Sequence, residues 1–457
     1  MLELANQKKL QLTDDIRKWF PYLFKQVNEP ISVQSLITHT SGIRDCYDLW
    51  SIQGYTWWEQ SFNNQDVLAL IAKQVDLNFK PNSAYLYSNT NYILLALIIE
   101  KVSGQSFVGY TNTMFKRLKM PNTSFEDNYK TIKGPIAKSY FNFGTWTTYD
   151  WIWNVCGDGN IFSTLSDQVQ WETLVQGKGE CDFNRQLIFE SQQFVKGSKY
   201  KNYGYGLEFS QYKGMNYVFH EGATGAWKAT VVRFPVQKTS IITLTNTGKS
   251  IPAMQTRQMV DILFNLKSDS AYFVTKPSSV GAFVETKDVL GMYINENDFW
   301  FQFIQKNNEL YLRREGRNDV ALEREANNIF HQKYDPAFKQ VFDIKPDGQK
   351  TVTAYYVNHS PYSLKKLQTD WAGFNFNSIN GTYKNTETNT TILIQYAESN
   401  NYRIQFNQSN AVNGILISPN KFLANGYSID IISNGNNEIL MYLNGSRIKQ
   451  LKYTLQQ

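Results

Sequence analysis

The chain is poor in the residues from which metal and redox centres are built. Its 457 residues include three cysteines, at Cys46, Cys156 and Cys181. Four histidines are scattered along it, at His39, His220, His331 and His359. The cysteines have no metal or redox spacing, so we expect free thiols. The histidines form no cluster with the spacing of metal ligands. We therefore expect a protein that uses neither a metal nor another cofactor.

Long apolar runs and runs of like charge are missing too. The longest apolar run, Tyr92 to Ile99, is far too short to span a bilayer, and no signal peptide is visible. The net charge of +6 is a mild excess spread along the chain, which does not indicate nucleic-acid binding. Hydrophobic residues make up 42% and charged residues 19%, as in ordinary globular proteins. The length allows two or three domains with a large core.

Residues 1–268 indicate a mixed α and β domain. Helices are expected from a Ser32 cap through Leu36, from Thr90 to Val102 before Gly104, from a Ser166 cap through Val175, and from Pro252 through Phe264. Strands are expected at 217–220, 226–234 and 240–246. The short links between these strands imply an antiparallel meander.

A different composition begins near Lys276-Pro277-Ser278-Ser279, so residues 269–282 are expected to form a linker. Beyond it, apolar residues alternate at Phe299, Phe301 and Phe303, and Asn307-Asn308 predicts a hairpin turn. A second stretch of the chain repeats this pattern of alternating strands and short strings. The repeated strings are Gly291-Met292-Tyr293 and Gly381-Thr382-Tyr383, and then Leu364-Lys365-Lys366-Leu367 and Ile448-Lys449-Gln450-Leu451. We expect two related β modules, 283–370 and 371–457, barrel-like or sandwich-like.

Four short strings in the first domain carry the functional signal. They are His39-Thr40-Ser41-Gly42, Tyr87-Ser88-Asn89, Gly157-Asp158-Gly159 and His220-Glu221-Gly222-Ala223-Thr224-Gly225. Their order and spacing resemble those of the penicillin-recognising serine hydrolases, which include class C β-lactamases, D-Ala-D-Ala carboxypeptidases, D-aminopeptidases and related esterases. The resemblance implies an α+β fold of the β-lactamase/transpeptidase type, with an antiparallel sheet flanked by helices. The β modules resemble, less strongly, the accessory β domains fused behind such hydrolases.

By this resemblance, Tyr87 acts near the general base and Asn89 holds the substrate amide. His220 belongs to the third motif on a strand that lines the cleft, Gly222 lets the substrate backbone approach, and the Ala223 N–H is one oxyanion donor. A tyrosine titrates near pH 10 and can act as a base at neutral pH only beside cations. The histidine motif and the Gly-Asp-Gly turn have a second, purely structural interpretation, which is the stronger one for the turn.

The family also needs a Ser-x-x-Lys motif, and no copy precedes His39. Lys9 to Asp15 resembles the stretch that follows the nucleophile helix, so we expect the chain to be truncated at its N-terminus, with true loss as the alternative. Ser-x-x-Lys strings do occur later in the chain, among them those that start at Ser198, Ser363, Ser418 and Ser446. None precedes Tyr87 or opens an apolar helix. Ser41 with His39 as base is also rejected, because residues two apart do not normally converge on one reacting atom.

The expected function is that of a serine hydrolase that cleaves an amide or ester of a small molecule or peptide through an acyl-enzyme. This chain lacks the nucleophile and is expected to be inactive as printed. The alternative is a non-catalytic, hydrolase-like protein that binds peptides or cell-wall fragments, with β modules that contact a partner or the cleft. The family resemblance implies a periplasmic or secreted location.

Overall fold

The computed structural model describes residues 1–56, 58–142, 144–266, 280–296, 298–314, 318–355, 361–433 and 438–456. The chain divides into two compact units. The first comprises Met1–Val260 and two short later segments, Asn385–Thr390 and Ser446–Leu451; the second comprises Asp261–Lys384, Thr391–Gly445 and Lys452–Gln457. The linker expected around Lys276-Pro277-Ser278-Ser279 lies outside the described residues.

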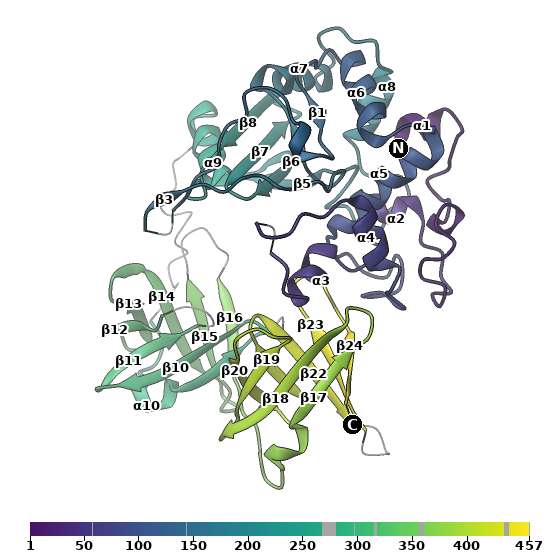
Figure 1. Cartoon of the computed structure of the whole chain (residues 1–457). Helices are drawn as coiled ribbons and strands as arrows, with labels where there is room; N and C mark the ends of the chain where they lie inside the picture. The colour runs from purple at the N-terminus through teal and green to yellow at the C-terminus, as the bar shows by residue number, and fades with distance from the viewer. Residues whose placement is uncertain are drawn as a thin grey trace. The chain divides into compact units, whose positions relative to one another are not determined.

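Helix α5 (Asn89–Ser103) is the centre of the first unit's core (Figure 1). Its side chains from Ile93 to Ile99 are buried, and Gly104 ends it with a φ of 72°, as the sequence predicts. The other helices are α1 (Leu2–Asn6), α2 (Val33–Ile37), α3 (Cys46–Ile52), α4 (Asn64–Ile71), α6 (Phe107–Arg117), α7 (Leu165–Val175), α8 (Arg185–Ser191) and α9 (Pro252–Leu263), with 3-10 turns at Ile16–Lys18 and Tyr129–Thr131. Ser32 caps α2 as predicted, because its Oγ accepts the N–H of Ser35 at 3.1 Å.

The predicted meander is confirmed and is longer than expected. Its strands are β5 (Glu208–Tyr212), β6 (Met215–Thr224), β7 (Trp227–Phe234) and β8 (Thr239–Thr245), which pair in this order, each antiparallel to the next. The sequence did not predict β5. Two short pairs complete the unit, β1 (Ser124–Phe125) with β4 (Ile161–Phe162) and β2 (Phe141–Asn142) with β3 (Trp146–Thr147).

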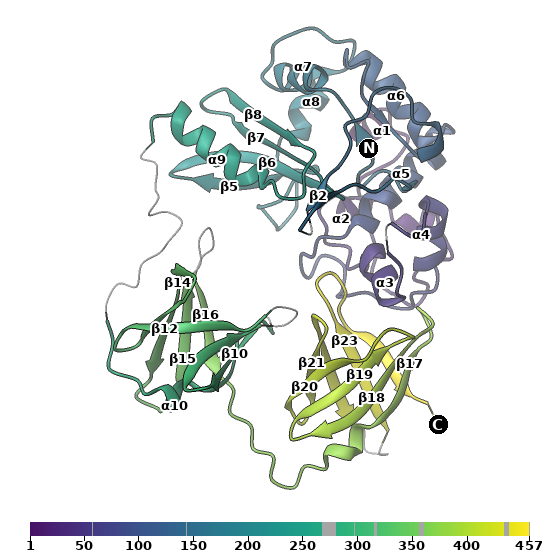
Figure 2. The ribbon, with the colours of Figure 1, turned by 60° about the vertical axis from the view of Figure 1, so that its left-hand side comes forward.

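Helices hold the sheet on both faces. Helix α9 lies across one face (Figure 2), where Thr256 and Thr243 share a 2.9 Å hydrogen bond. On the other side, Arg233 of β7 forms an ion pair of 2.7 Å with Glu172 of α7. Both side chains are at least nine-tenths buried, so the pair is shielded from water and fixes α7 against the sheet.

The N-cap of α7 differs from the prediction. The sequence analysis assigned Ser166, but the helix begins at Leu165 and its N-cap is Thr164. The Thr164 Oγ1 accepts the N–H of Asp167 at 3.2 Å, and Ser166 lies inside the first turn. Both residues are of the capping type, so the backbone path out of β4 decides which of them satisfies the free N–H.

The second unit contains two closed barrels (Figure 1), which decides between the barrel-like and sandwich-like alternatives. The first is built from β9 (Gly291–Ile294), β10 (Trp300–Lys306), β11 (Glu309–Arg313), β12 (Val320–Ala326), β13 (Ile329–Gln332), β14 (Asp335–Ile344), β15 (Lys350–Tyr355) and β16 (Tyr362–Lys366), with the short helix α10 (Thr286–Val289) before it. The second is built from β17 (Gly381–Asn385), β18 (Thr390–Glu398), β19 (Asn401–Phe406), β20 (Val412–Ser418), β21 (Lys421–Ala424), β22 (Tyr427–Ser433), β23 (Ile439–Asn444) and β24 (Leu451–Leu455), after a 3-10 turn at Phe376–Ile379.

Each barrel closes because its first strand pairs with its last, β9 with β16 and β17 with β24. The predicted hairpin turn is confirmed, since Asn307 and Asn308 join β10 to β11 with φ values of 47° and 64°. One detail of the repeat is wrong. Leu364 lies in strand β16, whereas Ile448-Lys449-Gln450 precedes β24 and belongs to the first unit.

Within the described ranges, no single helix combines the length and apolar character needed to cross a membrane; α5 and α6 meet that test only when taken together, as a pair bent by 86°.

Candidate active site

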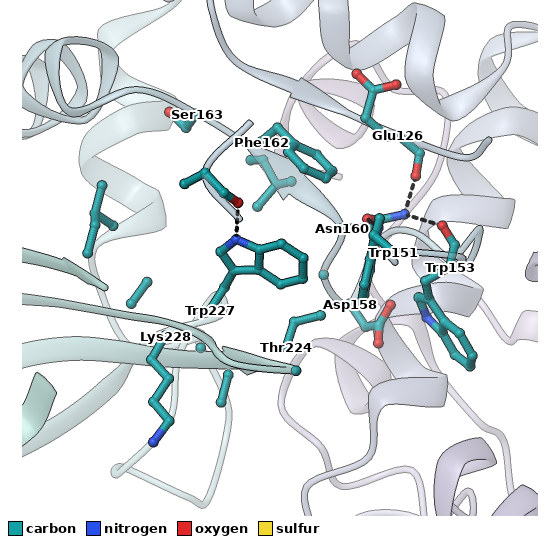
Figure 3. A pocket seen from close by; sticks show the side chains of 18 of the residues that line it. Glu126, Trp151, Trp153, Asp158, Asn160, Phe162, Ser163, Thr224, Trp227 and Lys228 are labelled. Carbon is teal, nitrogen blue, oxygen red and sulfur yellow. Dashed lines mark hydrogen bonds between the residues drawn. The ribbon is translucent and has the colours of Figure 1, made fainter. Parts of the chain in front are cut away.

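The structure brings the predicted site residues together at one cavity of the first unit, with a volume of about 2120 Å³. The residues come from separate segments, namely the start of α5 with the loop before it, the turn after Cys156 and the C-terminal half of β6. Those that line the cavity are Tyr87, Asn89, Asp158, His220, Gly222 and Ala223. Figure 3 shows part of the lining, in which Asp158 from the turn and Thr224 from β6 lie on the same cavity.

Tyr87 lies between two histidines and one arginine. Its ring centre is 4.1 Å from that of His39 and 6.5 Å from that of His220, and the Arg447 guanidinium carbon lies 5.0 Å from it. Burial, together with the Asp158 carboxylate, raises the pKa of Tyr87 to about 12, while Arg447 opposes the shift. At neutral pH the phenol therefore keeps its proton, and it can act as a base only if further positive charge nearby lowers its pKa so that it ionises.

His39 and Ser41 form a buried support beneath this tyrosine. The His39 Nδ1 accepts the N–H of Ser88 at 3.2 Å, and its Nε2 lies 3.1 Å from the hydroxyl of Tyr203. Burial lowers the pKa of His39 to about 3, so the ring is neutral. The Ser41 hydroxyl is fully buried and donates to Asn91 Oδ1 at 2.7 Å. These contacts favour a scaffold over a nucleophile.

Asn89 is tied to a carboxylate that the sequence analysis missed. Asp45 caps α3 and is fully buried, and its Oδ2 accepts both the backbone N–H and the Nδ2 of Asn89, each at 2.7 Å. One of the two amide N–H groups of Asn89 is therefore engaged with Asp45, which fixes the orientation of the side chain at the cavity. Asp45 follows the first motif closely in sequence, and its position before α3 was a capping signal that could have been used.

The end of β6 offers an open strand edge. Pairing with β5 ends at Phe219, so among the described residues no strand covers that edge from His220 to Thr224. An added Cβ at Gly222 would meet no atom within 4 Å, so internal packing does not require a glycine there. Open space beside a backbone edge is what an extended substrate needs. Burial lowers the pKa of His220, which keeps its ring neutral at pH 7.

The Gly-Asp-Gly turn combines packing with a titratable group. A Cβ at Gly157 would lie 2.7 Å from that of Ala96 on α5, and its φ is 113°, so glycine is needed for the close approach. The next residue, Asp158, accepts a hydrogen bond of 2.5 Å from the hydroxyl of Tyr47. Burial raises the pKa of Asp158 to about 7. The turn is thus a support that also places a carboxyl group at the cavity.

Aromatic side chains form another wall of the cavity (Figure 3). The rings of Trp151 and Trp227 meet edge to face with centres 5.5 Å apart. Asn160 fixes the loop that carries Trp151: its Nδ2 donates to the carbonyls of Glu126 and Trp153 at 2.5 and 3.2 Å, and its Oδ1 accepts from Trp151. This wall provides apolar contact area next to the polar groups.

In the part of the chain that the structure describes, no group of three or more His, Cys, Asp or Glu side chains is placed to hold a metal ion.

Comparison with known proteins identifies the family. The Beta-lactamase family profile matches residues 1–265, which is more than half of the chain. The chain therefore belongs to the β-lactamase family, and the fold expected from the four motifs is confirmed. It is similar to Protein flp of Staphylococcus aureus (strain MRSA252), 38% identical over 137 residues, which are 29% of this chain and 26% of the relative.

Two further relatives extend the comparison. Penicillin-binding protein 4* of Bacillus subtilis (strain 168) is 26% identical over 257 residues, 51% of this chain and 54% of the relative. The chain thus spans about a quarter to a half of the length of these curated relatives. The octameric penicillin-binding protein homologue from Pyrococcus abyssi superposes with a TM-score of 0.54 and 21% identity over 79% of this chain and 84% of that one, which shows a shared fold.

Proposed function

We propose that the cavity is the substrate site of a serine hydrolase that cleaves an amide or ester through an acyl-enzyme. The substrate class is a peptide, a D-amino-acid peptide or a β-lactam-like molecule, and the location is periplasmic or secreted. The observation that carries the proposal is the convergence of Tyr87, Asn89 and His220 on one cavity, beside the open backbone edge at Gly222. Scaffold residues alone would not require that opening.

Each group has a role that follows from its chemistry. Tyr87 moves a proton between nucleophile and leaving group, and the cations around it must lower its pKa for that task. Arg447 is one such cation, and the lysine of a Ser-x-x-Lys motif would be the second. The N–H of Ala223 donates to the oxyanion, together with the N–H of the nucleophile itself. Asn89 and the β6 edge orient the substrate backbone.

The nucleophile is the group that the printed sequence does not supply before Tyr87. We propose that the chain as printed forms no acyl-enzyme and that a Ser-x-x-Lys helix would fill part of the cavity. Exposed apolar side chains on the cavity lining support this binding position for the helix. They are Ile161, Leu244 and Ile251, whose exposed fractions lie between 45% and 55%. A helix with an apolar face would remove this surface from water.

A non-catalytic peptide-binding protein is the second candidate. The same cavity without a nucleophile favours it, since Tyr87, Asn89 and the β6 edge can hold a peptide without cleaving it. Both candidates share the substrate site and differ in whether a covalent bond forms.

Covalent labelling tests the proposal. The printed chain and a form extended before Met1 by an in-frame Ser-x-x-Lys helix are incubated with a fluorescent penicillin and with a fluorophosphonate. We expect labelling of the extended form alone. In that form Tyr87→Phe should reduce turnover by about 10²-fold or more, as for loss of a general acid or base.

A matched variant completes the experiment. Tyr85→Phe removes a neighbouring phenol that also lines the cavity and should leave labelling nearly unchanged. Labelling of the printed chain at any serine, Ser41 or Ser198 included, would show that our assignment of the nucleophile is wrong. An extended form that binds the probe reversibly without a covalent bond would favour the non-catalytic candidate.

A further inference from the structure

Two tryptophans on the cavity lining form a corner of aromatic surface. The ring planes of Trp151 and Trp227 are 84° apart, their centres are separated by 5.5 Å, and both side chains are half-buried. Figure 3 shows the two indoles among the side chains of the lining. Aromatic rings prefer to meet edge to face or offset, with centres about 4.5–7 Å apart, so a third ring fits such a corner.

The polar atom of each indole is already used inside the protein. Trp227 Nε1 donates to the carbonyl of Ala137 at 2.6 Å, and Trp151 Nε1 donates to Asn160 Oδ1 at 3.1 Å. An indole has one N–H donor and no acceptor, so neither ring offers a hydrogen bond to a ligand. Ile136, the residue before Ala137, also lines the cavity and is 42% exposed. The corner therefore presents apolar surface, which suits an uncharged ring.

Both indoles are supported by structure that is itself fixed. Trp153, two residues after Trp151, is 8% exposed, and its ring meets that of Trp50 edge to face at 6.0 Å. The segment that binds the other indole is held by Asn246, whose Nδ2 donates to the carbonyl of Lys138 at 2.8 Å. A site with ordered walls loses less conformational entropy when a ligand binds.

The strand register places the corner at the end of the open edge of β6. In the hairpin between β6 and β7, Thr224 pairs with Trp227, and both residues line the cavity. The edge from His220 to Thr224 therefore runs toward the two indoles. A peptide that lies along this edge would bring one of its side chains into the corner.

The charged side chains beside the corner are engaged within the protein. Lys228 follows Trp227 in β7, and its Nζ donates to two backbone carbonyls at 2.8 and 2.7 Å. On the side of Trp151, the Glu126 carboxylate accepts the hydroxyl of Ser124 at 2.6 Å. Neither charged group is thus directed at a ligand in the corner, which favours an uncharged side chain there.

We propose that Trp151 and Trp227 form a subsite that binds an aromatic side chain of a peptide substrate. The inference rests on the proposed function and adds to it the side chain that the cavity selects. Apolar area alone would favour a saturated ring equally, whereas contact between aromatic rings adds a contribution that depends on their π systems. Preference for an aromatic ring over a saturated ring of similar size is therefore the property that distinguishes this subsite.

Calorimetric titration of the full chain with four blocked tripeptides tests the inference. Each is acetylated and amidated, with alanine on either side of a central phenylalanine, cyclohexylalanine, alanine or lysine, in all-D and all-L forms. We expect the phenylalanine peptide to bind about 2- to 10-fold more tightly than the cyclohexylalanine peptide, the range for aromatic pairs beyond their buried area. It should exceed the alanine peptide by about 10-fold or more, because the whole ring is buried. The lysine peptide tests whether a cation stacks there instead.

Four variants locate the preference. Trp151→Leu and Trp227→Leu should each make the phenylalanine and cyclohexylalanine peptides bind equally. Trp227→Phe keeps a ring and should retain part of the preference. Trp146→Leu is the matched control, because Trp146 is 56% exposed and lies outside the cavity lining, and it should leave the preference unchanged. Circular dichroism verifies that each variant is folded.

Proton NMR of the phenylalanine peptide with the parent chain gives a readout that needs no variant. Its ring protons should shift upfield on binding, because they lie against indole faces. Equal binding of the phenylalanine and cyclohexylalanine peptides, tightest binding of the lysine peptide, or no binding at millimolar concentration would each overturn the inference. An unchanged preference in a folded leucine variant, or unshifted ring protons, would overturn it too. The proposed function is judged separately, by covalent labelling; a labelled extended form without aromatic preference would leave it standing.

Discussion

Asp158 shows how burial at the site has a cost that depends on pH. Its pKa rises from the ordinary 3.8 to about 7 in the folded chain, so between these values the folded state keeps a proton that the unfolded state loses. Because the folded state then binds more protons, the contribution of this group to stability falls as the pH rises from about 4 to about 7. Asp158→Asn removes that penalty and keeps an oxygen for the Tyr47 hydroxyl.

We therefore expect Asp158→Asn to stabilise the chain at pH 8 and to have a smaller effect at pH 4. Urea unfolding of parent and variant at the two pH values measures the difference. Asp150→Asn, at an exposed position, is the control and should show the same small effect at both. An Asp158→Asn effect that is equal at pH 4 and pH 8 would mean that the carboxyl is ionised in the folded chain at both.

Some residues of the site can be predicted from a short stretch of sequence around them, and others cannot. Tyr87, Asn89 and Gly222 were predicted as site residues because each stands in a short string that resembles a motif of the family, and the structure places all three on one cavity. The position of Arg447 on the same cavity could not be predicted, since hydrogen bonds from Asn78 and Arg44, which lie hundreds of positions earlier, hold its segment there. Long-range contacts of that kind form only when the chain folds, and no local pattern in the sequence predicts them.

At the scale of elements, the cap of α7 can be tested with a matched pair. Thr164 Oγ1 satisfies the N–H of Asp167, while Ser166 is exposed in the first turn. We expect Thr164→Ala to lower the free energy of unfolding by about 1 kcal/mol. Ser166→Ala should change it by no more than about 0.5 kcal/mol. Urea unfolding of both variants gives the comparison, and a larger loss for Ser166→Ala would restore the original assignment.

Elements were predictable where one physical signal dominated. The 3.6-residue repeat of α5, ended by Gly104, and the alternation of β10 around the Asn307-Asn308 turn each fixed an element from local residues. Strand β5 was missed because its burial is partial and its polar residues, such as Gln211, hide the alternation. It exists because β6 supplies a pairing edge, which is a tertiary effect.

At the scale of the whole molecule, the second unit has the features of an independently folding part. Each barrel closes its own hydrogen-bond ladder, so neither depends on another strand for its edges. The first encloses a core that includes Tyr293, Phe301 and Phe342. Within this unit the barrels also touch, through Met292 with Ile417 and Leu423, and through the Lys421–Asp298 ion pair of 2.9 Å.

We therefore expect residues 280–457 to fold when expressed alone. The segments Asn385–Thr390 and Ser446–Leu451 belong to the first unit, but they lie at or beside strand ends, so the strand pairing that closes each barrel does not depend on the first unit. Circular dichroism should show β structure, and heating should give one cooperative transition or two closely spaced ones. Phe342→Ala is the control: it removes a fully buried ring from the first barrel and should lower the melting temperature through a loss of about 3–5 kcal/mol. A disordered spectrum without a cooperative transition would show that the barrels need the first unit, because the loops that contact it would then be required for closure.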